Sequence, residues 1–135
     1  MGILSRLFAS GSDDRQRDDD KRQNFKELER LYTGDSEMIN NAKALWLTSR
    51  GNYYGERGDL DQAILDFKEA ITFKPDHIPA FLGLGVAYKY KRMFQEALAV
   101  LRNAPRKWKL YGQEHEADSE MIQQLHTLIR ELERR

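Results

Sequence analysis

The sequence predicts an all-α fold of about six helices that pack as successive hairpins. Two observations lead to this prediction. Apolar side chains recur along most of the 135 residues at the i, i+3, i+4, i+7 spacing of half-buried helices. The chain also matches itself when it is shifted by 34 residues, which indicates a repeated helix pair. No segment has a convincing strand pattern.

The composition is that of a soluble globular domain, with 40% apolar and 33% charged residues. The 22 basic and 22 acidic residues give a formal net charge of zero, which argues against a protein that coats nucleic acid. The chain has no cysteine, which excludes disulfides, thiolate metal sites and cysteine nucleophiles and suits a cytoplasmic location. No apolar run is long enough to cross a bilayer.

Residues 1–17 are expected to form a flexible N-terminal segment, because residues 10–20 include no apolar side chain to bury. A single helical domain then covers 18–135. Near the N-terminus, four apolar side chains share one face of a very short helix: Ile3, Leu4, Leu7 and Phe8. This face would touch a membrane surface or a partner only weakly, and a frayed terminus is the alternative that we favour.

The expected helices cover residues 18–33, 36–56, 60–73, 77–91, 94–104 and 118–134. The first has an apolar stripe of Phe25, Leu28, Leu31 and Tyr32. Glycine and proline supply the boundaries, since Gly34, Gly58, Pro75 and Pro105 each fall where the apolar period stops. Asp35 or Ser36 can cap the second helix, and Asp118 or Ser119 the last. A loop with Trp108, Tyr111 and Gly112 is expected before the last helix.

The self-match at 34 residues places small residues on small ones and large apolar residues on large ones. The matching pairs are Leu47 and Phe81, Gly51 and Gly85, Tyr54 and Tyr88, Leu60 and Phe94, Ala63 and Ala97, Ile64 and Leu98, Phe67 and Leu101, and Ala70 and Ala104. A repeated helix hairpin has this property because each unit packs the same face against its neighbour. Small residues at a helix crossing allow the two backbones to approach.

This order of residues resembles the tetratricopeptide repeat, whose pattern is W-x2-L-G-x2-Y, then A-x3-F, then P. The first unit, about 44–77, contains Leu47-x2-Arg50-Gly51-x2-Tyr54, then Ala63-x3-Phe67 and Pro75. The second, about 78–104, contains Phe81-x2-Leu84-Gly85-x2-Tyr88, then Ala97-x3-Leu101. The alternative is an antiparallel helix bundle in which the self-match at 34 residues is accidental. This alternative explains the joint match of so many positions less well.

Three positions depart from the repeat pattern. Arg50 occupies an apolar position, Arg92 stands where the first unit has Gly58, and Pro105 comes early enough to shorten the second unit. Because a stack needs about three repeats to bury its core, the helices over 18–33 and 118–134 are expected to cover the two ends of the repeat pair.

The resemblance implies an interaction module, an adaptor or scaffold, whose first helices line a groove for a peptide or helix of a partner protein. Carried over position by position, the groove residues are Leu45, Thr48, Asn52, Pro79, Leu82, Val86, Lys89 and Tyr90. Their mixture of apolar, amide and cationic groups suits a segment with apolar anchors and an acidic group. The alternative is that the terminal helices fill the groove.

A basic and aromatic stretch over 89–111 offers a second hypothesis, binding of single-stranded nucleic acid. Its members are Lys91, Arg92, Arg102, Arg106, Lys107, Trp108 and Lys109. A solvated face balanced by the acidic residues downstream is the reading favoured by the neutral net charge. A third hypothesis is a homo-oligomer formed by stacking of repeats.

No catalytic, cofactor or metal site is expected. The three histidines lack metal-ligand spacing, and His77 and His126 are expected to be ordinary surface residues. Gly83 and Gly85 lie inside a predicted helix, which makes them packing residues and not a phosphate-binding loop.

Overall fold

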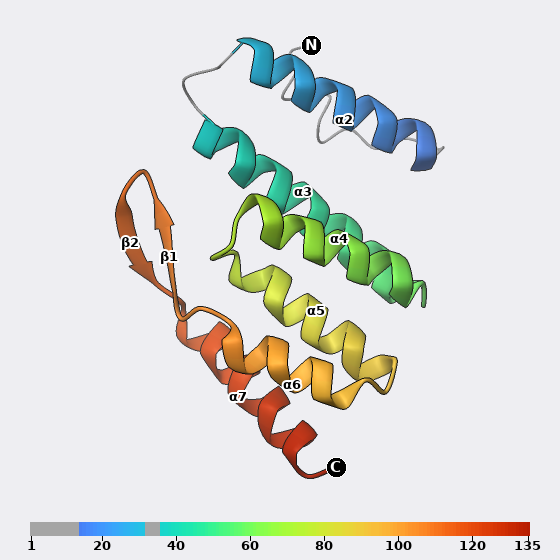
Figure 1. Cartoon of the computed structure of the whole chain (residues 1–135), viewed down its shortest axis with the longest axis vertical. Helices are drawn as coiled ribbons and strands as arrows, with labels where there is room; N and C mark the ends of the chain where they lie inside the picture. Colours follow the sequence, from blue (N-terminus) through green and yellow to red (C-terminus); the bar gives the residue numbers. More distant parts are fainter. Residues whose placement is uncertain (1–13, 32–35) are drawn as a thin grey trace. The chain divides into compact units, whose positions relative to one another are not determined.

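The computed structural model describes residues 14–31 and 36–135, and within them it has six helices and one two-stranded sheet (Figure 1). The elements are α2 (Asp14–Leu31), α3 (Ser36–Glu56), α4 (Leu60–Phe73), α5 (Ile78–Tyr90), α6 (Phe94–Asn103), β1 (Lys107–Leu110), β2 (Gln113–Glu116) and α7 (Ser119–Glu133). The all-α prediction is confirmed, and the helices from α3 to α7 begin and end within a residue or so of their expected bounds. None of the described helices has the length and apolar character of a membrane span.

The chain divides into two compact units, Met1–Asn40 and Asn41–Arg135. In the first unit α2 starts at Asp14, earlier than the expected residue 18, because the first turn of a helix does not depend on apolar side chains. Phe25 and Leu28 are buried as predicted, whereas Leu31 is 53% exposed. The predictions for Tyr32, for the boundary at Gly34 and Asp35, and for the apolar face Ile3, Leu4, Leu7 and Phe8 lie outside the described residues.

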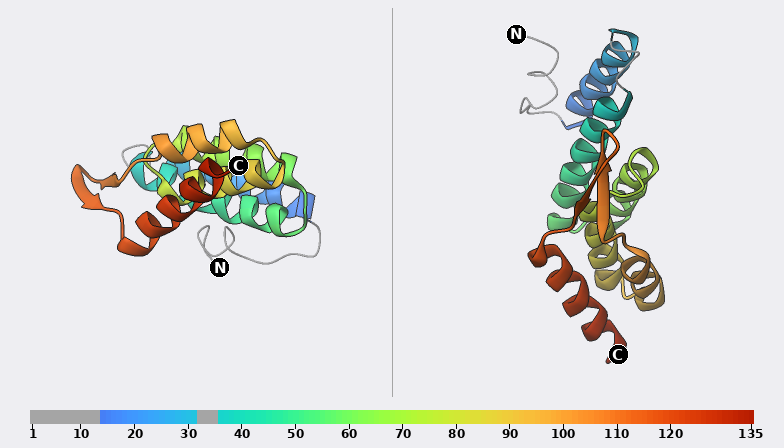
Figure 2. Two further views of the ribbon diagram at one scale, coloured as in Figure 1. Left: turned by 90° about the horizontal axis from the view of Figure 1, so that it is seen from below. Right: turned by 90° about the vertical axis from the view of Figure 1, so that its left-hand side faces the viewer.

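In the second unit, helices α4, α5 and α6 form a row of neighbours, with α4 against α5 and α5 against α6 (Figures 1 and 2). Helix α7 packs on both α5 and α6, as expected of a helix that covers the end of the second repeat. Asp118 caps α7 by accepting a hydrogen bond from the backbone N–H of Met121 at 2.8 Å. Leu125 and Leu132 of α7 are buried.

Two glycines occupy equivalent close approaches in the two repeats. A Cβ at Gly51 would lie 2.8 Å from Cε1 of Phe67, and a Cβ at Gly85 would lie 2.5 Å from Cδ2 of Leu101. Both pairs are related by the 34-residue shift. The expected role of small residues where the two helices of a unit cross is therefore confirmed.

The turn between the two helices of each repeat also has the same backbone structure. Gly58 has a φ of 83° and Arg92 a φ of 62°. The N–H of the residue after each donates to a tyrosine carbonyl, Asp59 to Tyr54 and Met93 to Tyr88, both at 2.9 Å. Arg92 therefore departs from the repeat in sequence and not in geometry, and its left-handed conformation costs about 1–2 kcal/mol relative to glycine.

The departure at Arg50 is explained by a buried ion pair between α3 and α4. The guanidinium of Arg50 donates from Nε to Oδ2 of Asp66 at 2.8 Å and from Nη2 to Oδ1 at 2.6 Å. Gln62 donates a further hydrogen bond to Oδ1 at 3.0 Å. The Asp66 side chain is 1% exposed, and the guanidinium also lies 5.0 Å from the ring of Trp46. The charge of Arg50 can replace the usual apolar side chain because Asp66, 16 residues later in the chain, pairs with it.

The segment expected to be a loop around Trp108 is instead an antiparallel hairpin, which corrects the prediction that no strand is present. β1 pairs with β2 so that Trp108 faces His115 and Leu110 faces Gln113. Tyr111 and Gly112 connect the strands with φ values of 50° and 78°, the left-handed conformations that a two-residue type I′ turn requires. The hairpin extends from the end of α6 before the chain enters α7 (Figure 2).

Candidate partner-binding site

Four of the predicted groove residues line one hollow between α3 and α5, which we call the α3–α5 pocket. They are Asn52 near the end of α3, and Leu82, Val86 and Tyr90 along α5. The hollow has a volume of about 700 Å³, within the range of ligand sites in proteins. Tyr90 is 68% exposed, which is unusual for so large a side chain at a position with apolar neighbours.

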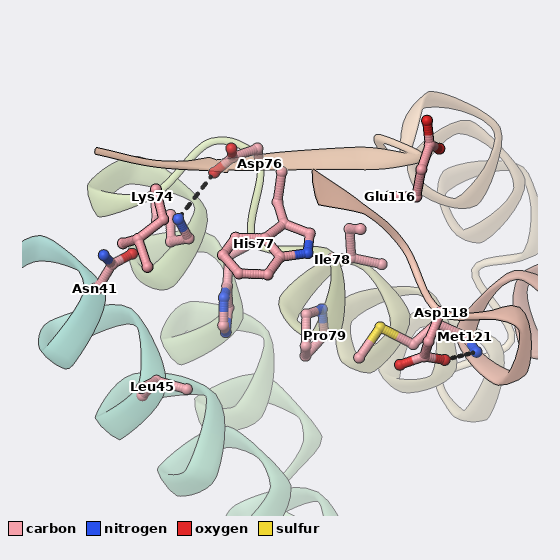
Figure 3. A pocket seen from close by; sticks show the side chains of 12 residues that line it. Asn41, Leu45, Lys74, Asp76, His77, Ile78, Pro79, Glu116, Asp118 and Met121 are labelled. Atoms are coloured by element: carbon pink, nitrogen blue, oxygen red, sulfur yellow. Dashed lines mark hydrogen bonds and ion pairs between the residues drawn. The ribbon is translucent and has the colours of Figure 1, made fainter. Parts of the chain in front are cut away.

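Two other groove residues, Leu45 and Pro79, line a second hollow of about 520 Å³, which we call the hairpin pocket (Figure 3). Its walls come from α3, from the α4–α5 turn, from the β-hairpin and from the start of α7. Trp108 and Met121 contribute much of its apolar lining. The hairpin therefore gives this end of the helix array a wall that the repeat pattern alone does not provide.

The remaining two predicted groove residues do not line either hollow. Thr48 is 6% exposed, because it shares the buried face of α3 with Ala44, Leu47 and Gly51. The structure therefore does not place Thr48 in the groove, where the sequence predicted it. Lys89 donates to Oε2 of Glu131 on α7 at 2.8 Å, and this bond lowers the pKa of the Glu131 carboxyl. Lys89, which was expected to pair with an acidic group of a partner protein, thus pairs with an acidic group within the chain.

The hairpin is fixed to the turn between α4 and α5 by two polar contacts. Lys74 Nζ donates to the carbonyl of Lys109 at 3.0 Å, and the N–H of Lys109 donates to the Asp76 carboxylate. Lys74 and Asp76 also form an ion pair at 3.3 Å. Trp108 completes the attachment, because its ring lies 5.6 Å from Lys74 Nζ and stacks on His115 with centroids 4.3 Å apart.

His77 was expected on the surface, but the structure buries it at the start of α5, where it is 8% exposed and lines the hairpin pocket. Its Nε2 is buried and has no hydrogen-bond partner among the described residues. Burial, with a smaller contribution from the positive charge of Lys74, lowers the pKa of His77 from 6.5 to about 4, although Asp76 opposes the shift.

This burial makes folding stability depend on pH. Between about pH 6.5 and pH 4.5 the unfolded chain binds a proton at His77 and the folded chain does not, so stability should fall as the pH falls through this window. We expect a loss of about 2 kcal/mol, less than the full shift implies because the imidazole keeps some access to solvent. Urea unfolding at a series of pH values measures this loss. His77→Gln should remove most of it, whereas an equal loss in that variant would contradict the assignment.

The residues of the basic stretch lie before, within and after α6. Lys91 and Arg92 precede α6, whereas Arg106, Lys107 and Lys109 follow it. Carboxylates accompany several of its charges, with ion pairs from Lys91 to Asp61, from Arg102 to Glu133 at 3.0 Å and from Lys107 to Glu114 at 2.9 Å. Arg106 donates to the carbonyl of Ala104, and Trp108 is engaged by His115 and Lys74.

Comparison with known proteins places the repeat within a family. Residues 51–91 match the family model described as TPR repeat, which covers the C-terminal end of α3, all of α4 and all of α5. No curated protein matches the chain. The matched segment contains the first interhelical turn, the Phe67 contact and most of the α3–α5 pocket. Residues 51–91 are therefore similar to the tetratricopeptide repeat, and the helix pairs and the repeated glycine contacts agree with this similarity.

Proposed function

We propose that this protein is an adaptor that binds an extended or helical segment of a partner protein in the α3–α5 pocket. Tetratricopeptide repeats generally mediate protein–protein interaction and are typically not enzymes. The observation that carries the proposal is the α3–α5 pocket itself. Leu82 and Val86 are only half-buried there, and Tyr90 is largely exposed beside them.

The chemistry of the pocket suits a peptide with apolar anchors. Leu82 and Val86 offer an apolar floor, while the carboxamide of Asn52 can both donate to and accept from a peptide backbone. An acidic partner group at Lys89 would compete with Glu131. Solvent and salt screen an ion pair exposed to this degree, so such an exchange carries little cost.

The test is a selection of binding peptides from a random library, followed by calorimetric affinities for matched variants. Leu82→Asp should weaken binding of the selected peptides at least about tenfold, because it places a charge in the apolar floor. Leu65→Asp is the control, since Leu65 is 61% exposed on α4 and lines neither hollow. Thermal unfolding of both variants checks that each is folded. Peptides that bind Leu82→Asp as tightly as the unsubstituted chain would show that the pocket is not the binding site.

A further inference from the structure

The charge that lines the α3–α5 pocket is one-sided. Glu56, the last residue of α3, supplies the only charged side chain among the described residues around this hollow. It is exposed, and no ion pair or hydrogen bond joins its side chain to another residue in the described part of the chain. Arg57 follows it directly, but Arg57 lines neither hollow and donates to the Tyr53 hydroxyl at 2.8 Å. The α3–α5 pocket is therefore negative, although the chain as a whole has no net charge.

The end of α3 adds to this negative charge. The last carbonyl groups of a helix form the negative end of its dipole, where a basic side chain is favourable and an acidic one is unfavourable. Helices α5, α6 and α7 each have a basic residue in their last turn, namely Lys89, Arg102 and Arg130. Helix α3 has none there and ends on Glu56 instead. A cation from outside the chain would be stabilised by both the carboxylate and the helix end.

The groups beside Glu56 suit a long basic side chain. Asn52 lies one helical turn earlier on the same face of α3, so its carboxamide and the Glu56 carboxylate project from neighbouring positions. Lys and Arg carry several N–H donors at the end of a hydrocarbon stem. The donors can reach these oxygens while the stem covers the half-buried side chains of Leu82 and Val86. An acidic group would be repelled by Glu56, and a neutral group would leave its charge unmatched.

We propose that the α3–α5 pocket selects a partner segment that carries Lys or Arg beside its apolar anchors, with the cation paired to Glu56 at the end of α3. This assignment rests on the adaptor function proposed above and gives the chemical class of the partner segment. It replaces the acidic group that the sequence suggested, because Lys89 lines neither hollow and pairs with Glu131 at 2.8 Å.

The test compares two display libraries of short peptides that have the same length and the same apolar content. One library encodes Lys and Arg at its charged positions, and the other encodes Asp and Glu. Both are selected at low salt against the intact protein. The best basic peptides should bind about tenfold more tightly than the best acidic ones. Acidic peptides that bind as tightly as the basic ones would overturn the choice of a cation.

Leu82→Asn separates that result from a failure of the adaptor proposal, because it removes an apolar side chain of the pocket without adding a charge. If acidic and basic peptides bind equally well and both are weakened by Leu82→Asn, the adaptor proposal stands and the preference for a cation is wrong. If Leu82→Asn weakens none of the selected peptides, they bind elsewhere and both proposals are wrong.

Two neutralising variants test the role of Glu56 itself. Glu56→Gln should lower the affinity of the basic peptides about three- to fivefold and reduce its dependence on salt, since one exposed carboxylate is lost. Glu96→Gln is the matched control, because Glu96 is an exposed residue of α6 that lines neither hollow, and it should leave the affinity unchanged. Equal losses in the two variants, or no loss in Glu56→Gln, would overturn the assignment. Thermal unfolding checks that each variant is folded.

Discussion

Replacing Asp66 with alanine is expected to lower the free energy of unfolding by about 3–5 kcal/mol, because it removes the carboxylate that pairs with the Arg50 guanidinium at a mostly buried site. Three hydrogen bonds to the carboxylate are lost at once, two from Arg50 and one from Gln62. Urea unfolding followed by circular dichroism measures the change. A loss below 1 kcal/mol would show that the pair is solvated and unimportant for the fold.

The matched control removes both charges together. Arg50→Leu restores the apolar residue of the repeat pattern, and combined with Asp66→Leu it should leave stability nearly unchanged or higher, since well-packed apolar residues can replace a buried ion pair. The double variant must therefore be more stable than Asp66→Ala alone. The opposite order would contradict the view that removing the carboxylate beside the buried Arg50 guanidinium causes the loss.

Phe67→Ala is the second substitution with a large expected effect, again about 3–5 kcal/mol. The Phe67 ring is 2% exposed, and it occupies the space that the missing Cβ atoms of Gly51 and Gly83 leave open. Gly51 belongs to the first repeat and Gly83 to the second, so this single ring joins the two repeats. Its removal leaves a cavity between them.

Leu65→Ala is the matched control for Phe67→Ala, because Leu65 lies on the same helix and is 61% exposed. It should change stability by less than about 0.5 kcal/mol, as substitutions at exposed positions usually do. Chemical denaturation of the two variants side by side gives both values. Similar losses for Phe67→Ala and Leu65→Ala would mean that the ring does not join the repeats.

The helices and their repetition could be predicted because both depend on local signals. The match of Gly51 with Gly85 correctly located the two close helix crossings, and Pro75 correctly placed the end of α4. Asn52, Leu82, Val86 and Tyr90 were placed on one groove through their position in the repeat, and all four line the α3–α5 pocket. Thr48 was misplaced, because the same helical period also fits the buried face of α3.

The hairpin could not be predicted because its signals are weak and distant. Each strand has only four residues, and the turn uses Tyr111 before Gly112 instead of the more usual asparagine. Opposite charges that face each other, Lys107 with Glu116 and Lys109 with Glu114, were the available clue. The burial of His77 follows from the docking of this hairpin on Lys74 and Asp76, more than 30 residues earlier in the chain.

We propose above that partners bind on the face of α5 that carries Leu82 and Val86. The most direct measurement is an NMR titration of a library-selected peptide into isotope-labelled protein. If the α3–α5 pocket is the binding site, we expect the largest chemical-shift changes at Asn52, Leu82, Val86 and Tyr90. Changes centred instead on the exposed face of α4 around Leu65, with α5 unaffected, would contradict it.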